Sequence, residues 1–332
     1  MRVGKLTPKE LQEHVFSYLV QRRPEVKLRS ALGEDSTIMD LGDHFCVMST
    51  DPITGAVDKA GWLAVHVSAN DVASNGAEPV CCLMTILMPA GTSMEFIAQV
   101  MKDAAQAAKE LDIEISGGHT ELTAAVNKPV ISTTVVGKAS KDMLISSDGA
   151  KPGDQIVVTK NIGLEGTAIL ATDAKEYLST FLSQQEIEEA TKMLAAISVV
   201  KEGILSTEFG VNAMHDITEG GLLGALYEMA EGAELGFSIE EEKVPLAAVT
   251  NKICQHLGLD VLRFLSSGSM LIATDRGEQL LEHLGKAGIE SSIIGEFTQS
   301  RDKFLTRQNK KIKIDPPEGD ELWRGLEIID KK

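Results

Sequence analysis

Apolar residues recur along this chain at two different spacings, and the alternation of the two predicts a layered α/β protein. Between residues 94 and 111 they return every three or four positions, which is the spacing of an amphipathic helix. Residues 80–88 form a continuous apolar run instead, which predicts a strand buried on both faces. We therefore expect strands covered by helices in each half of the chain.

The same criteria applied to the whole chain predict helices and strands in alternation. Helices are expected at 8–20, 61–73, 94–111, from about 165, 184–206, 220–231, 246–257 and 276–285. Strands are expected at 45–50, 80–88, 113–116, 130–136, 155–159, 211–215, 235–240, 269–274 and 291–297. The Gly- and Pro-punctuated stretch 146–154 is the best linker, and 332 residues suit two domains, so we expect domains at 1–148 and 149–332.

Composition and charge narrow the class of protein. A hydrophobic content of 43% with 24% charged residues is typical of globular domains. The net charge of −17 opposes binding to nucleic acid or to an anionic membrane, and no apolar stretch approaches the ~18 residues of a membrane span. Four cysteines without CxxC spacing favour reduced thiols over a zinc site. We expect a cytoplasmic protein.

Two acidic residues, Asp51 and Asp71, adjoin or interrupt apolar segments. Asp51 directly follows an apolar strand, the end at which α/β proteins place ligands, although Asp before Pro is also common in turns. Asp71, after Asn70, interrupts an apolar helix, where a buried charge requires a partner or a metal. A surface-facing Asp71 is the alternative.

A glycine pair follows the strand at 113–116 and suggests a phosphate contact. Gly117 and Gly118 would let backbone N–H groups approach phosphate oxygens, and Thr120 and Glu121 could reach a magnesium ion. A simple turn would use the same glycines, and a histidine such as His119 is more often structural than catalytic.

Two further glycine-bearing turns lie in the second half. Gly163–Thr167 joins a strand to a helix and resembles an anion-binding helix start, but helix–sheet packing explains its glycines equally well. In Asp216–Leu222, Asp216 ends a strand and Thr218 precedes a helix, either as a ligand contact or as a helix N-cap. Because these candidates supply oxygen ligands without a His/Cys cluster, they favour Mg²⁺, which commonly arrives with nucleotide phosphates.

In this order the motifs resemble the AIR synthase-related (PurM-like) superfamily. That group includes aminoimidazole ribonucleotide synthetase, the hydrogenase-maturation protein HypE, selenophosphate synthetase and thiamine-monophosphate kinase. The matching stretches are Gly33–Ser36, Ser49–Asp51, Ala69–Ala73, Gly76–Pro79, Gly117–Glu121, Val136-Gly137, Gly163–Thr167, Asp216–Leu222 and Ser267-Gly268.

The resemblance implies an N-terminal PurM-like α/β domain that forms a β-barrel with a second copy, hence a homodimer, and a C-terminal α/β sandwich. It also implies ATP and Mg²⁺ as cofactors, bound mainly by the N-terminal half. By motif, the magnesium-facing residues would be Asp35, Asp51 and Asp71. The nucleotide contacts would be Asn70, Gly117, Gly118, Thr120 and Gly137, with Asp216 and Thr218 from the second domain, and the candidate catalytic residues are His119 and Glu121.

Within the superfamily the stretches Ile162–Leu170 and Asp216–Leu222 look most similar to the HypE-like branch, which implies a maturation-type protein partner. HypE ends in a cysteine tail that carries a carbamoyl group, whereas the last cysteine here is Cys254. We therefore expect phosphoryl transfer to an oxygen of another small or protein-borne acceptor. The alternatives are a nucleotide-binding accessory protein without turnover and a purine-pathway synthetase.

Overall fold

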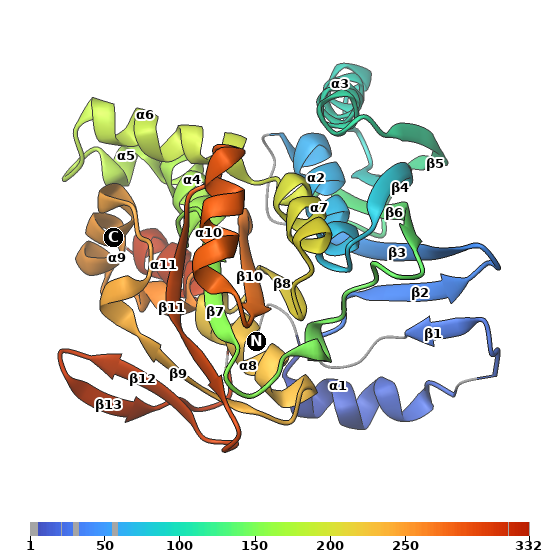
Figure 1. Ribbon diagram of the computed structural model, residues 1–332. Helices are drawn as coiled ribbons and strands as arrows, with labels where there is room; N and C mark the ends of the chain where they lie inside the picture. The colour runs from blue at the N-terminus through green and yellow to red at the C-terminus, as the bar shows by residue number, and fades with distance from the viewer. Residues whose placement is uncertain (1–5, 21, 29–32, 55–58, 318, 332) are drawn as a thin grey trace. The chain divides into compact units, whose positions relative to one another are not determined.

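The computed structural model describes residues 6–20, 22–28, 33–54, 59–317 and 319–331, which fall into two compact units (Figure 1). Glu34–Leu144 with Gln21–Ser30 form the N-terminal unit. Ile145–Lys332 with Met1–Val20 and Ala31–Gly33 form the C-terminal unit. Each unit contains one mixed sheet with helices packed on it, so the predicted α/β class is confirmed.

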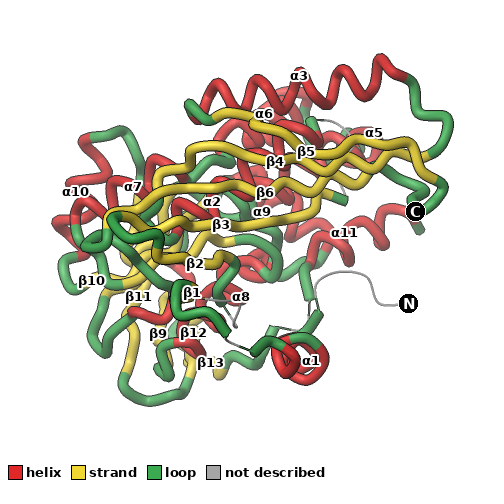
Figure 2. The backbone as a smooth tube through the Cα atoms, turned by 90° about the vertical axis from the view of Figure 1, so that its right-hand side faces the viewer, coloured by secondary structure: helices red, strands yellow, loops and turns green. Residues whose placement is uncertain are grey.

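The N-terminal unit is a six-stranded sheet with two helices. Its elements are β1 (Val26–Leu28), β2 (Ser36–Asp40), β3 (His44–Ile53), α2 (Ala60–Ser74), β4 (Glu78–Pro89), α3 (Met94–Leu111), β5 (Glu114–Thr123) and β6 (Val130–Ser140). The strand order is β1-β2-β3-β6-β4-β5, and Figure 2 shows β2, β3, β6, β4 and β5 running side by side. All neighbours are antiparallel except β4 and β5, which are parallel because α3 connects them.

The helices cover one face of this sheet only. α2 packs on β3, β6 and β4, and α3 packs on α2 and β5. On β4, therefore, Met84 and Ile86 are buried whereas Leu83 on the other face is 46% exposed. The prediction that residues 80–88 are buried on both faces was wrong, because no second layer of this unit's described residues covers the other face.

The C-terminal unit is a seven-stranded sheet of order β13-β12-β9-β11-β7-β10-β8. Its strands are β7 (Gln155–Thr159), β8 (Ala213–Ile217), β9 (Gly236–Glu240), β10 (Ser269–Thr274), β11 (Ser291–Thr298), β12 (Lys303–Arg307) and β13 (Lys310–Lys313). Its α-helices are α1 (Pro8–His14), α4 (Leu164–Asp173), α5 (Lys175–Leu178), α6 (Gln184–Lys192), α7 (Val200–Phe209), α8 (Gly221–Gly232), α9 (Ala248–Leu257), α10 (Gly277–Lys286) and α11 (Glu321–Asp330).

The central strands of this sheet are buried on both faces. On β7, Ile156 and Val158 face the core formed with α8, while Val157 faces the core formed with α7 and α10. This double burial explains why the strand reads as a continuous apolar run. A third core joins α4, α6, α9 and α11. No helix among the described residues is long and apolar enough to cross a membrane.

The predicted helix over 184–206 is in fact two helices, α6 and α7, separated by a short 3-10 helix and three residues without regular structure. Lys160 explains the break. Its Nζ donates to the backbone carbonyls of Ala196 (2.8 Å) and Ser198 (2.6 Å), which removes them from a helical ladder. Its charge is balanced by Glu202 at 2.7 Å.

Candidate functional site

The acidic motifs of the N-terminal unit converge on Ser49, a residue of β3. The Ser49 hydroxyl lies 2.5 Å from the Asp71 carboxylate and 3.1 Å from the Asp35 backbone carbonyl. Ser36 donates in turn to the Asp71 carbonyl at 3.3 Å. Residues distant in sequence, on the loop before β2, on β3 and on α2, therefore meet at one point.

Asp51 belongs to the same group because side chains two residues apart on a strand point to the same face. Ser49 and Asp51 both lie on the face of β3 on which α2 packs. Asp71 is only 4% exposed and Asn70 is fully buried, so the surface-facing alternative for Asp71 is wrong. Asp35 is exposed and Asp51 half-buried, so this group of carboxylates reaches solvent.

Gly117 and Gly118 lie inside β5, which runs on to Thr123, and not in a turn as predicted. The reason is the close approach of β4. A Cβ on Gly118 would stand 1.9 Å from the Met84 carbonyl oxygen, and Gly118 has φ +145°. A Cβ on Gly117 would meet only the Leu83 side chain, at 3.4 Å. Glycine is thus required for strand packing at Gly118, whatever else it contacts.

The sheet register divides the predicted residues of β5 between two faces. Asp51 pairs with Thr133, Thr133 with Met84, and Met84 with Gly118, which forms one row across four strands. Three strand spacings separate its ends, roughly 14 Å. Gly118 and, two residues on, Thr120 therefore share the face of Asp51.

His119 and Glu121 lie on the opposite, open face and contact each other, with His119 Nε2 3.0 Å from Glu121 Oε2. Both side chains are exposed. Within this unit the structure does not bring them to the acidic group around Ser49, and their catalytic role stays a prediction. Gly137 is buried beneath α2, where a Cβ would stand 2.4 Å from Val72, so helix packing accounts for this glycine.

The predicted residues of the C-terminal unit lie at the end of β8. Asp216 is 1% exposed, and its carboxylate is 3.7 Å from Nδ1 of His215, which contacts Glu228 at 3.1 Å through Nε2. The alternative prediction, that Thr218 is the N-cap of α8, is wrong. The N-cap is Gly220, which has the left-handed conformation. The Thr218 carbonyl accepts from Gly221 instead (3.1 Å).

The segment Gly163–Thr167 forms the first turn of α4, with Gly163 as N-cap. Its glycines serve packing: a Cβ on Gly166 would stand 2.7 Å from the Phe264 ring. The Gly163 N–H donates to the Ser266 hydroxyl at 2.8 Å, so this donor is already used within the protein.

Two buried carboxyl groups of the C-terminal unit escaped sequence analysis. Burial raises the pKa of Glu165 to about 7, with the carboxylates of Asp320 and Glu219 adding to the rise and a hydrogen bond from Ser267 opposing it. Burial also raises the pKa of Asp320 to about 6. Asp320 could have been suspected as a helix N-cap before Glu321 and Leu322, but its long-range partners have no local signal.

The donors around Ser49 suit a hard cation. They are carboxylate, hydroxyl and carbonyl oxygens, the ligands that Mg²⁺ prefers. In the described part of the chain no three His, Cys, Asp or Glu side chains are grouped closely enough to hold a metal by themselves. Mg²⁺ in proteins is commonly held by one or two carboxylates together with substrate phosphates.

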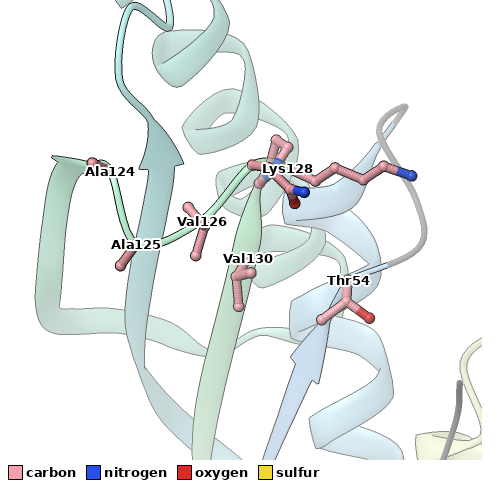
Figure 3. A pocket seen from close by; sticks show the side chains of 8 residues that line it. Thr54, Ala124, Ala125, Val126, Lys128 and Val130 are labelled. Carbon is pink, nitrogen blue, oxygen red and sulfur yellow. The ribbon is translucent and has the colours of Figure 1, made fainter. Parts of the chain in front are cut away.

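A surface hollow of about 450 Å³ lies elsewhere on the N-terminal unit (Figure 3). The hollow is lined by Thr54, after β3, by residues 124–129 of the β5–β6 connection and by Val130 at the start of β6. None of the predicted site residues belongs to this lining, so the hollow adds nothing to the acidic group around Ser49.

Comparison with known proteins assigns the chain to a family. Residues 33–139 match the N-terminal domain, and residues 151–308 the C-terminal domain, of the AIR synthase related protein. A "Putative hydrogenase expression/formation protein" of Methanocaldococcus jannaschii is 30% identical over 334 residues, covering 95% of this chain and 96% of that protein. The chain belongs to the AIR synthase related family.

Several of the similar proteins are hydrogenase-maturation proteins. The carbamoyl dehydratase HypE of Escherichia coli is 28% identical over 257 residues, covering 76% of this chain and 74% of that protein. A crystal structure of E. coli HypE is 25% identical with a TM-score of 0.75, covering 91% of this chain and 95% of that one. The predicted similarity to the HypE-like branch is confirmed.

Two HypE complexes share the fold. HypE in a HypE–HypF complex has a TM-score of 0.76 at 24% identity, covering 92% of this chain and 99% of that one. HypE in complex with ATP has a TM-score of 0.67 at 23% identity, covering 89% and 90%. The fold of this AIR synthase related chain is therefore one on which an ATP complex is known.

Proposed function

We propose that this chain is an ATP- and Mg²⁺-dependent enzyme of the HypE-like branch that activates an oxygen of an acceptor by phosphoryl transfer. The observation that carries the proposal is the convergence on Ser49, which joins the Asp71 carboxylate and the Asp35 carbonyl beside Asp51. The Asp71 carboxylate is buried in the last turn of α2, at the helix end where a negative charge is disfavoured, so a bound cation would stabilise it. The HypE–ATP complex on the same fold supports nucleotide as the companion of that cation.

Most of the predicted residues have a role in this proposal. Asp35, Asp51 and Asp71 would hold magnesium, which supplies neutralisation of phosphate charge. Gly117, Gly118 and Thr120 on β5 would lie along the nucleotide, with Asn70 buried beside Asp71 on α2. In the C-terminal unit, Asp216 and Thr218 are the proposed nucleotide contacts.

We also propose that the chain forms a homodimer through the open face and edge of its six-stranded sheet. Leu83 on the open face of β4 and Leu122 on the edge strand β5 are 46% and 45% exposed, and a second copy would bury such large apolar side chains. The acceptor would be a small molecule or a group carried by a maturation-type protein, which the HypE–HypF complex supports.

Binding and turnover of Mg-ATP by the wild type and by Asp71→Asn test the function. Asparagine keeps the acceptor for Ser49 but removes the charge, so we expect the affinity for Mg-ATP to fall at least ten-fold, about 1.4 kcal/mol. Asp103→Asn, a helical aspartate on α3 that accepts from Gln99, is the control and should bind normally.

Three outcomes of this experiment separate the candidate functions. A wild type without calorimetric signal for Mg-ATP would refute the nucleotide site. Equal affinity of the wild type and Asp71→Asn would refute the role of Asp71. Binding without release of ADP or phosphate, over a panel of carbamoyl, amide and phosphate acceptors, would favour an accessory protein over an enzyme.

A further inference from the structure

The carboxylate of Asp320 binds three backbone N–H groups that belong to three different segments. Oδ2 accepts from Gly220 at 2.7 Å, and Oδ1 accepts from Leu265 at 3.2 Å and from Leu322 at 2.7 Å. The Leu322 bond makes Asp320 the N-cap of α11. The bonds to Gly220 and Leu265 are long-range, and Gly220 directly follows the proposed ligand-contacting residues Asp216–Glu219.

The Gly220 bond fixes the turn between β8 and α8. Gly220 is the left-handed N-cap of α8 and follows directly on Asp216–Glu219. Gly221 cannot carry a side chain, because its Cβ would stand 2.8 Å from the backbone of Arg263. The turn is thus held on one side by the chain at 262–264 and on the other by Asp320.

The neighbouring residue of α11 holds the other end of the same backbone segment. The Glu321 carboxylate accepts from the Asp260 N–H at 3.2 Å, while Asp320 accepts from Leu265 five residues later. From Leu265 the connection continues, since the Ser266 N–H donates to the Thr218 carbonyl at 3.4 Å and the Ser266 hydroxyl accepts from Gly163. The start of α11 therefore ties together the turns that carry Thr218, Ser266 and Gly163.

We propose that Asp320 is a positioning residue of the nucleotide site, through which docking of α11 and binding at the Asp216–Gly221 turn are linked. The inference rests on the proposed function, which assigns this turn a ligand contact. A carboxylate that orders the turn before the ligand binds lowers the conformational entropy cost of binding. Linkage requires the effect to run both ways: ligand at the turn must tighten the docking of α11.

Asp320→Asn separates this role from that of a helix cap. The amide oxygen can still accept from Leu265 and Leu322, so α11 keeps its N-cap. The amide nitrogen, a donor, then faces the Gly220 N–H and cannot accept from it. Ser183→Ala is the control: Ser183 caps α6 of the same unit with a capping box, away from these turns.

The experiment measures Mg-ATP affinity by calorimetry and backbone amide exchange by mass spectrometry at pH 8. We expect Asp320→Asn to weaken Mg-ATP binding about ten-fold, the equivalent of one hydrogen bond to a charged group, and to speed exchange at Gly220 and Gly221. In the wild type, Mg-ATP should slow exchange in the first turn of α11. The control should lose thermal stability and keep its affinity.

Unchanged affinity and unchanged exchange at Gly220 in Asp320→Asn would overturn the inference. If the wild type itself fails to bind Mg-ATP, the proposed function fails. The amide exchange at Gly220 and Gly221 still decides whether Asp320 orders the turn, and unchanged exchange would then overturn that role as well.

Discussion

The buried carboxyl group of Glu165 makes a quantitative prediction about stability and pH. Its pKa is raised from 4.5 to about 7 by burial, with Asp320 and Glu219 nearby. A carboxyl group with a raised pKa holds its proton more tightly in the folded than in the unfolded state. Its contribution to stability is therefore complete below pH 4.5 and is lost as the pH rises through 7.

The size of the effect follows from the shift. Each pKa unit corresponds to 1.36 kcal/mol, so the full loss above pH 7 is at most about 3 kcal/mol. Glu165→Gln keeps the shape and the hydrogen bond to Ser267 but cannot ionise. We expect it to unfold at the same temperature as the wild type near pH 4.5. At pH 8 its melting temperature should exceed that of the wild type by about 5 °C or more for a unit of this size.

Scanning calorimetry from pH 4.5 to 8, following the transition of the C-terminal unit, measures this difference. Glu176→Gln, on the exposed surface of the neighbouring α5, is the control and should follow the wild type at each pH. Parallel curves of melting temperature against pH for the wild type and Glu165→Gln would refute the reasoning, because they would mean that Glu165 titrates equally in both states.

Two further predictions concern groups that the fold buries. Lys160→Met removes the partner of Glu202, which is 4% exposed, and should lower the free energy of unfolding by about 3–5 kcal/mol in chemical denaturation. The double variant with Glu202→Gln should recover part of this loss, and fully additive effects of the two substitutions would contradict the pairing. Gly118→Ala should abolish folding or lower the melting temperature sharply because of the contact with Met84, whereas Gly117→Ala should fold; equal stability of the two would contradict the register of β4 and β5.

Sequence patterns located most of the helices and strands because burial imposes a regular period. The helix at 94–111 was predicted at its observed bounds, and so were the strands at 155–159 and 269–274, whose continuous apolar runs reflect burial on both faces. The prediction failed where a distant side chain decides the local structure. Lys160, which is distant in sequence, binds the Ala196 carbonyl and ends the helical region there. No local sequence pattern indicates this contact.

The hairpin of β12 and β13 and the helix α11 were also missed. β13 has only four residues and all of them are exposed, so it lacks the alternation by which half-buried strands are recognised. The hairpin turn depends on positive φ angles at Gln308 and Asn309, which a sequence only weakly signals.

For the site, the sequence by itself determined which oxygen donors are available and that they occur in an order typical of one family. Asp51 was found because it directly follows an apolar strand, and Asp71 because a carboxylate inside an apolar helix is costly. Only the tertiary structure decided which of them meet. Ser49 joins Asp35 to Asp71 across segments far apart in sequence, and strand register places His119 and Glu121 on the other face of the sheet. Meeting depends on pairing between strands and helices, and that information is not local to any motif.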